Sequence, residues 1–501
     1  MKRAILLTLV FGIASSGLSQ AQELARSLPG IWQGTVKTGS EPHRAVLQLP
    51  KASADPKTAT LDIEFFPDYL KVDSLTQDAS HLKFTVNGGK ASFDGKLSAD
   101  GNTLAGVLTF DHVPLPVELH RTAAVAAWHV PFRYQYHYKD ITIPRPSPDE
   151  AKIPFSLRLA VDYMEKGASA WSNERQCVAC HTNGSYMAVR PLMTERLGPP
   201  PQAMHDFFVT ALKDQLLPDP DDPKGQAAVV QASTQVIYIA AGLAIWDANV
   251  SHRLSPETAQ ALNLMFSLQR PAGDWFVDDD NNPPLESSAY QVATVAARAI
   301  ANAPGWLDQQ KGTPGNPSIA AKVELLKQFL RVGGKMQGDY DRVDLLWTAS
   351  EYPGLLNDAQ KQQLIEMILN HQQIDGGWSI RTFAKPEEWG KGNRADKLKA
   401  EIEYRDPPSD GHMTGLAIIA LRKSGIPASD PRIQRGVAWL LANQRSSGRW
   451  WTRSLNRDNW QFISYSSTVY PLLALDLCDA LKPESLKAAS GSQLAHTPNG
   501  K

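Results

Sequence analysis

The sequence predicts a multidomain protein, in which a small antiparallel β-barrel-like domain is followed by an all-α domain of paired helices. Between residues 28 and 121, short runs of alternating apolar and polar residues are separated by turn-forming Gly, Asn and Asp. From residue 155 almost to the end, longer apolar patterns of helical period alternate with loops. The length of 501 residues also exceeds one ordinary core, since a domain spans roughly 100–200 residues.

The β-rich domain is expected over residues 22–123. Residues 45–49 and 82–86 alternate in the manner of half-buried strands, and turn signals follow at 87–89 and 100–102. Seven or eight such strands in a meander predict a small barrel. Residues 124–154 are rich in aromatic residues and proline, which predicts a linker packed against its neighbours.

Both ends of the chain carry recognisable patterns. Lys2 and Arg3 precede an apolar run that gives way to small and polar residues up to Ala21, which predicts a signal peptide over residues 1–21 and a periplasmic or secreted protein. The run is shorter than the ~20 residues of a membrane-spanning helix, so no transmembrane segment is expected after cleavage. Residues 483–501 are rich in Ser, Gly and Pro and are expected to be disordered.

The composition argues against a polyanionic partner. Hydrophobic residues make up 42% of the chain and the formal net charge is -1, as in an ordinary globular protein. Because a basic face is the usual footprint of nucleic-acid binding, we expect no nucleic-acid partner.

An internal repeat of the form Gln-x3-Gly-x-Trp occurs three times with identical spacing. Its residues are Gln269, Gly273 and Trp275; Gln372, Gly376 and Trp378; and Gln444, Gly448 and Trp450. We expect the glutamine to close the C-terminus of a helix, the glycine to allow a sharp exit turn, and the tryptophan to pack against the next helix. These residues are therefore expected to hold the scaffold together rather than to bind a ligand.

The repeat resembles the QW motif of squalene-hopene and oxidosqualene cyclases, a toroid shared with protein prenyltransferases. The resemblance covers residues 155–482 and implies an α/α toroid with a central cavity, which would suit a terpenoid or other apolar ligand. The helical patterns correspond to five or six helical hairpins.

The chemistry of those families is not matched by the sequence. Squalene-hopene cyclases protonate their substrate with an Asp-x-Asp-Asp-Thr-Ala segment, which is absent here, so terpene cyclase activity is doubted. The nearest acidic segments are Asp278-Asp279-Asp280 and Asp339-Tyr340-Asp341. Clustered carboxylates can raise one pKa for general-acid work, which makes residues 278–280 candidate catalytic acids, although their Pro- and Asn-rich loop is also typical of a solvated turn.

Zinc of the prenyltransferase type would need Asp, Cys and His ligands. Cys478 and His412 are the residues that could take part, but the flanking pattern of that family is missing.

A Cys-x-x-Cys-His segment is the most chemically specific stretch of the chain. Cys177, Cys180 and His181 resemble the haem c attachment site of c-type cytochromes, and the resemblance covers only this segment. It implies that both thiols bind the haem vinyl groups and that His181 is the proximal iron ligand. Met193 is the first candidate for the distal ligand, and an open sixth position is the alternative.

Two other uses of the cysteines remain open. Cys177 and Cys180 could form a redox disulfide, although no thioredoxin-like βαβ pattern surrounds them. A structural zinc ion would need two further ligands at paired spacing, and no second such pair follows.

The leading hypothesis is an exported haem c-binding protein on a squalene-cyclase-like toroid. It would transfer electrons to a redox partner protein or oxidise an apolar ligand. One alternative is a terpenoid or lipid cyclase-like enzyme that uses acidic cavity residues. The other is a non-catalytic binding module.

Overall fold

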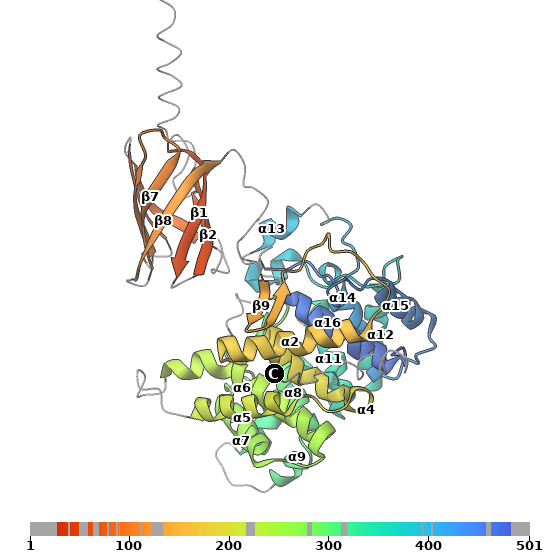
Figure 1. Cartoon of the computed structure of the whole chain (residues 1–501). Helices are drawn as coiled ribbons and strands as arrows, with labels where there is room; N and C mark the ends of the chain where they lie inside the picture. The colour runs from red at the N-terminus through yellow and green to blue at the C-terminus, as the bar shows by residue number, and fades with distance from the viewer. Residues whose placement is uncertain are drawn as a thin grey trace, which may run out of the picture. The chain divides into compact units, whose positions relative to one another are not determined.

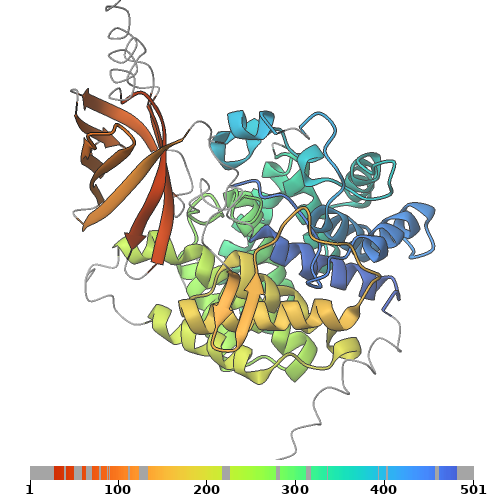
Figure 2. The same ribbon diagram turned by 45° about the horizontal axis from the view of Figure 1, so that its top comes forward.

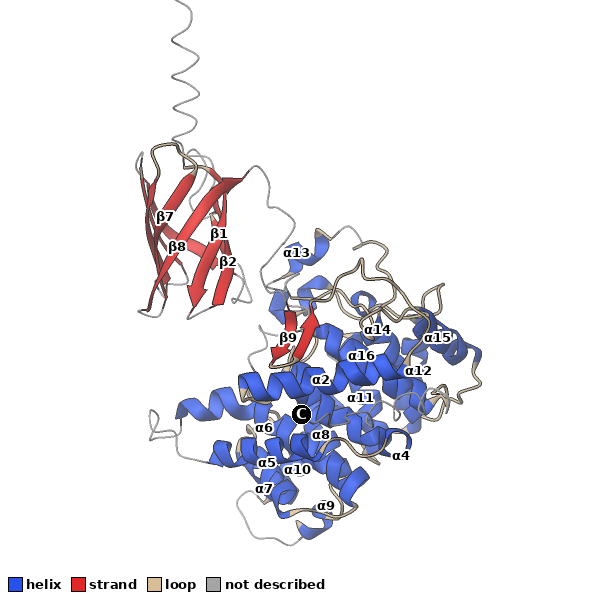
Figure 3. Cartoon of the chain, in the orientation of Figure 1, coloured by secondary structure: helices blue, strands red, loops and turns tan. Residues whose placement is uncertain are grey.

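Strands build the first part of the chain and helices most of the second (Figures 1 and 3). The computed structural model describes residues 28–481, apart from 39–40, 50–58, 64–69, 78–79, 87–88, 90, 111–112, 123–133, 217–225, 278–282, 312–317, 336, 393, 402–403 and 457–461. The chain divides into two units, Met1–Phe132 and Arg133–Lys501. The predicted signal peptide and C-terminal tail lie outside the described residues.

The first unit is a closed barrel of eight antiparallel strands. Each strand pairs with the next in the chain, and β1 also pairs with β8, with Ile31 opposite Thr122. The strands are β1 (Gly30–Thr38), β2 (Glu41–Leu49), β3 (Thr60–Ile63), β4 (Leu70–Gln77), β5 (His81–Val86), β6 (Ala91–Leu97), β7 (Thr103–Phe110) and β8 (Val113–Thr122). The prediction of a small antiparallel barrel is confirmed.

Side chains fill the barrel. Burial alternates along β5, β6 and β8, as expected where one face of each strand points inward. Trp32 is fully buried and donates its indole N–H to the Leu28 carbonyl at 2.9 Å. The rings of Phe84 and Phe93 stack across β5 and β6 with centroids 5.0 Å apart. The barrel therefore has an apolar core of its own.

The second unit is helical, as predicted. Its longer helices are α2 (Leu157–Arg175), α5 (Gln202–Leu216), α6 (Gln226–Trp246), α7 (Pro256–Ser267), α8 (Ala289–Asn302), α10 (Ile319–Gly333), α11 (Asp339–Glu351), α12 (Asp358–Asn370), α14 (Gly411–Lys423), α15 (Pro431–Ala442) and α16 (Ile463–Leu477). Shorter helices include η3 (Cys180–Gly184), α3 (Ser185–Val189), η4 (Arg190–Met193), α4 (Thr194–Leu197), α9 (Trp306–Gln309) and α13 (Ala395–Lys399).

The helices fall into two classes by burial. α8, α11, α14 and α16 are buried over most of their length. α7, α10, α12 and α15 bury one stripe and expose the rest, which is the pattern of helices on the outside of a core. Ser or Asp side chains cap the N-termini of helices in both classes, as Ser288 does for the buried α8 and Ser255 for the outer α7.

The buried helices contact one another in chain order. α3 packs on α6, α6 on α8, α8 on α11, α11 on α14 and α14 on α16, and α16 packs in turn on α3. The helices of this unit run from yellow through green to blue along the chain in Figure 2. Some outer helices also contact the inner helix that follows them in the chain, as α7 contacts α8 and α15 contacts α16. Among the described residues, no helix combines the length and apolar character needed to cross a membrane.

The segment before α2 lies against the helical unit. It contains a hairpin of β9 (Tyr134–Tyr138) and β10 (Ile141–Pro144), and Tyr136 of β9 is buried in the helical core. Further along, the Ile153 N–H donates to the Gln444 carbonyl at 2.9 Å. This segment therefore joins residues that are about 290 positions apart in the chain.

Candidate functional site

The three repeat motifs share one hydrogen-bond arrangement. In each motif, the glutamine Nε2 donates to the carbonyl oxygen of the motif's own glycine. It also donates to a second carbonyl oxygen, which lies on the next outer helix in the first two copies and just before α2 in the last copy. Gln269 donates to Gly273 and Lys322, both at 3.0 Å. Gln372 donates to Gly376 at 2.8 Å and to Arg432 at 2.7 Å. Gln444 donates to Gly448 at 2.8 Å and to Ser156 at 3.0 Å. The glutamine thus joins two repeats.

The motif glycines approach the backbone of the same partner helices. All three have φ between 92° and 94°, in the left-handed region that glycine favours. A Cβ atom at Gly448 would lie 2.2 Å from the Leu159 carbonyl oxygen, and one at Gly273 would lie 2.4 Å from the Leu325 oxygen. Both the turn and the close approach therefore require glycine.

The motif tryptophans are fully buried and bind back to their own helices. Trp275, Trp378 and Trp450 each donate the indole N–H to the carbonyl ten residues earlier, at 2.7, 2.7 and 2.8 Å. The Trp378 ring also lies against Gly436 of α15, the next outer helix. These contacts are all within the scaffold, in line with the expected structural role.

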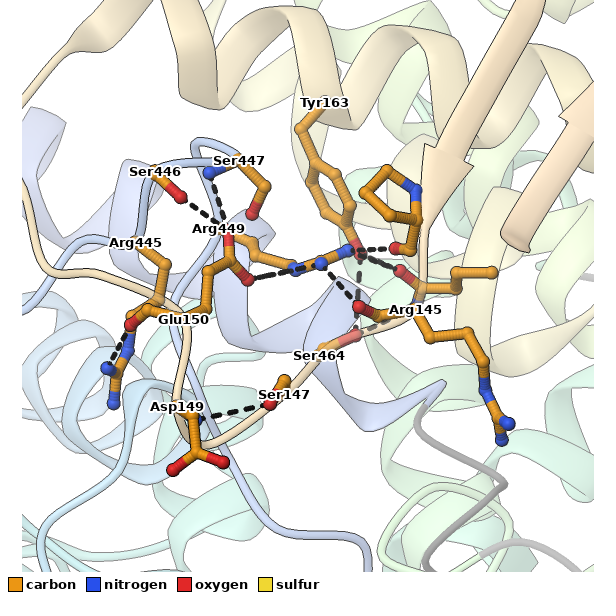
Figure 4. Close-up of polar contacts among 12 residues, drawn as sticks. Arg145, Ser147, Asp149, Glu150, Tyr163, Arg445, Ser446, Ser447, Arg449 and Ser464 are labelled. Carbon is orange, nitrogen blue, oxygen red and sulfur yellow. Dashed lines mark hydrogen bonds and ion pairs between the residues drawn. The ribbon is translucent and has the colours of Figure 1, made fainter. Parts of the chain in front are cut away.

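The third motif holds a buried arginine that the other copies lack. Arg449 donates to Glu150 at 3.2 and 3.1 Å and to the carbonyl oxygens of Pro144 and Arg145 at 2.8 and 2.9 Å (Figure 4). Glu150 also accepts the backbone N–H of Ser447 at 2.6 Å. The segment before α2 is therefore fastened to the last repeat.

The Cys-x-x-Cys-His segment lies where α2 ends. Gln176 closes α2 in the left-handed conformation, and Cys180 begins the short helix η3. Cys177 is half-buried and Cys180 is buried, and both are free thiols. Burial raises the pKa of both thiols, so they are protonated at neutral pH.

Aromatic rings fix the orientation of His181. Its imidazole stacks on Phe462 with centroids 4.3 Å apart and meets Trp171 edge-on at 4.7 Å. Nδ1 lies 2.9 Å from Thr182 Oγ1, whereas Nε2 has no hydrogen-bond partner in the part of the chain that the structure describes. Burial lowers the pKa of His181 to about 3, so the ring is neutral at pH 7, the form that binds metal ions.

This donor set fits a covalently attached haem. Two free thiols three residues apart are followed by a neutral imidazole with one nitrogen occupied and the other available. Met193, the predicted distal ligand, is a fully buried side chain of η4. Its role as the distal ligand stays a prediction.

Cys180 also leads into a polar cluster in the interior of the helical unit. Its Sγ donates to Glu286 Oε2 at 3.5 Å, and the Glu286 N–H donates to Gln291 Oε1 at 3.0 Å. The Gln291 side chain also lies beside the Asp344 carboxyl on α11, where it opposes the rise in pKa that burial causes. A chain of polar contacts therefore runs from the cysteine segment to α8 and α11.

Two carboxyl groups of this interior have raised pKa values. Burial raises the pKa of Asp341 to about 7, and the neighbouring Asp344 adds to the rise. Burial also raises the pKa of Asp344 to about 6, against the opposing effect of the Arg298 guanidinium. A carboxylic acid in this range can hold or release a proton at neutral pH, as a general acid must.

Aromatic residues from the remaining inner helices border the same cluster. Burial raises the pKa of Tyr238 on α6 well above its usual value, and the nearby Cys180 and Tyr470 contribute. His412 on α14 lies between Tyr340, whose OH is 3.0 Å from Nε2, and Tyr470, whose ring centroid is 5.1 Å away. Each inner helix from α6 to α16 thus contributes a side chain.

The sequence-predicted acids are not part of what can be described. Asp278, Asp279 and Asp280 lie outside the described residues. In contrast, Asp341 belonged to the second acidic segment of the sequence and lies in the interior cluster. The sequence analysis did not anticipate Asp344 or Arg298. The sequence signal available for Arg298 is that it is the lone charged residue in the otherwise mostly apolar helix α8.

Comparison with known proteins does not assign the chain. No protein-family model and no curated protein matches it. Among the described residues, no group of three or more His, Cys, Asp or Glu side chains is placed to hold a metal ion.

Proposed function

We propose that this chain is an exported haem c protein whose haem is attached at Cys177 and Cys180 and borders the interior of an α/α toroid. The observation that carries the proposal is the donor set itself, two free thiols and a fixed neutral imidazole in Cys-x-x-Cys-His order. Electron transfer to a redox partner protein or oxidation of an apolar ligand is the corresponding activity.

The toroid is supported by the order of helix contacts. The inner helices contact one another in sequence and α16 returns to α3, while the third repeat motif binds the start of the first long helix. Six outer and inner pairs, from α2 with α3 to α15 with α16, would complete the ring. A ring of this kind would place Cys180 toward its centre.

The protein residues would position the group in defined ways. His181 Nε2 would bind the iron, while Thr182 holds Nδ1 and Phe462 with Trp171 fixes the plane of the ring. A haem with a histidine ligand supplies one-electron redox chemistry when bound, and burial of its surroundings tunes the potential.

The test is a pyridine haemochrome spectrum and an intact mass on protein exported together with cytochrome c maturation factors. We expect a c-type α-band and a haem-sized mass increase in the wild type. Both should be lost in the double variant Cys177→Ala/Cys180→Ala. Cys478→Ala is the matched control, because Cys478 is a largely buried free cysteine outside the segment.

A colourless wild type of apoprotein mass would refute the haem proposal. The second candidate is then an enzyme that uses an interior carboxylic acid on an apolar substrate. It is favoured by the pKa of about 7 at Asp341, which keeps a proton available in a buried site. Calorimetric titration with an apolar alcohol tests whether that interior binds a substrate-like molecule.

A further inference from the structure

Two buried carboxyl groups on α11 each keep one oxygen without a partner. Asp341 Oδ2 accepts from Ser288 Oγ at 2.9 Å, whereas Asp341 Oδ1 has no hydrogen-bond partner in the described chain. Asp344 Oδ2 likewise has no hydrogen-bond partner there. Because the two residues are three positions apart on one helix, they lie on the same face.

A buried donor without a partner lies beside these acceptors. Arg298 of α8 is 6% exposed, and its Nη1 makes no hydrogen bond within the described residues. Its guanidinium lies over the Trp347 ring, with Cζ 3.9 Å from the centroid. It also lies close enough to Asp344 to oppose the rise in the pKa of that carboxyl caused by burial. Leaving a buried polar group without a hydrogen bond destabilises the folded chain, so three such groups in one region require an explanation.

The surroundings of the three groups are aromatic. The Tyr470 ring meets Trp347 edge-on with centroids 6.1 Å apart. Tyr238 and Tyr340 are buried side chains that interact electrostatically with members of the cluster. Flat aromatic side chains favour contact with an apolar body.

Charge restricts the polar group that would fit. An anion would be repelled by the carboxylates, and a cation would be repelled by Arg298. A neutral hydroxyl both donates and accepts, so it satisfies a carboxyl oxygen and a guanidinium N–H together.

We propose that the interior of the helical unit binds an apolar molecule through a hydroxyl group, which donates to a free oxygen of Asp344 or Asp341 and accepts from Arg298 Nη1. The proposal goes beyond haem attachment and does not depend on it. It identifies α8 and α11 as the helices that select the ligand's polar end.

The probe pair is farnesol and farnesyl methyl ether, which share an apolar body and differ in the hydroxyl proton. Calorimetric titration of the exported full-length chain, produced with and without maturation factors, gives both affinities. We expect the alcohol to bind roughly tenfold more tightly than the ether, because the ether leaves a carboxyl oxygen unpaired. This comparison needs no variant, and a protein without haem can still be tested.

Variants then locate the binding site. Asp344→Asn and Arg298→Met should each reduce the affinity for farnesol about tenfold and bring it close to that of the ether. Asp308→Asn, an exposed carboxylate paired with Lys311, should leave it unchanged. Circular dichroism and the thermal midpoint of unfolding show whether each variant folds. If one of the two variants does not fold, Asp341→Asn is tested in its place.

Equal affinities for the alcohol and the ether would overturn the proposal, as would the absence of binding by both. In either case water, not a ligand, would occupy the unpaired groups. Unchanged farnesol binding in folded Asp344→Asn and Arg298→Met variants would also overturn it, because the alcohol would then bind elsewhere.

Discussion

Asp341 should make the stability of the helical unit depend on pH in an identifiable way. Its pKa is about 7 in the folded chain, against an ordinary value of 3.8. Below pH 4 the carboxyl is protonated in both folded and unfolded chains. As the pH rises from 4 to 7, only the unfolded chain loses the proton, so folding stability falls by up to about 1.4 kcal/mol per pH unit.

Chemical denaturation of the wild type and Asp341→Asn at several pH values measures this effect. The free energy of unfolding of the wild type should fall relative to the variant between pH 4.5 and 7 and level off above pH 7. Asp308→Asn is the comparison, because the Lys311 ion pair lowers the pKa of Asp308 and no titration is expected in that interval. Parallel curves for the wild type and Asp341→Asn would contradict the raised pKa.

At the residue scale, the sequence predicted what is local and missed what is assembled by folding. Cys177, Cys180 and His181 lie within five consecutive residues, so their pattern could be recognised directly. Arg298 lies on α8 and Asp344 on α11, 46 positions later in the chain. The two side chains meet only in the packed interior. No single stretch of sequence contains that pair.

At the scale of elements, Gly448 should resist substitution more strongly than a glycine with the same backbone conformation elsewhere. Gly448 and Gly425 both have φ of 94°. A Cβ atom at Gly425 would meet nothing within 4 Å, whereas one at Gly448 would lie 2.2 Å from the Leu159 carbonyl oxygen of α2. Alanine at either position carries the left-handed strain of roughly 1–2 kcal/mol, and only Gly448→Ala must also displace a helix.

Thermal and urea denaturation of the two alanine variants separate these effects. We expect Gly448→Ala to be less stable than Gly425→Ala by roughly 1–3 kcal/mol, the usual cost of overpacking. Equal destabilisation would show that the repeat motif does not depend on close approach to α2.

The elements themselves were predictable because their patterns are regular. Alternation in β5 and β6 and the helical period of α8 or α15 each reflect one buried face. The β9–β10 hairpin was not foreseen within the predicted linker. Burial along Tyr134–Tyr138 does not alternate regularly, so the run lacks the usual pattern of a strand. The buried Tyr136 packs against Tyr465, a residue far away in the sequence.

At the scale of the whole molecule, the Arg449 network joins the beginning and the end of the helical unit. Sequence periodicity cannot reveal such a closure, because Glu150 and Arg449 are 299 positions apart. The guanidinium is almost fully buried and donates to the Glu150 carboxylate and to the carbonyl oxygens of Pro144 and Arg145. The arrangement fastens residues 144–150 to the last repeat.

Arg449→Met should therefore loosen the junction while leaving the barrel intact. Removing one partner of a buried ion pair typically costs 3–5 kcal/mol, because the remaining charge is left uncompensated. Hydrogen exchange followed by mass spectrometry should show lost protection over residues 144–153 and at the start of α2. Protection of β1–β8 should be unchanged, since the barrel is a separate unit with its own apolar core.

Two comparisons make that prediction specific to closure of the helical unit. Arg432→Met removes an exposed arginine paired with Asp430 and should change stability by no more than about 1 kcal/mol. Adding Glu150→Gln to Arg449→Met removes the uncompensated carboxylate and should restore part of the lost stability. If Arg449→Met exchanged like the wild type at residues 144–153, the network would not hold the first and last repeats together, and the helix contacts alone would have to do so.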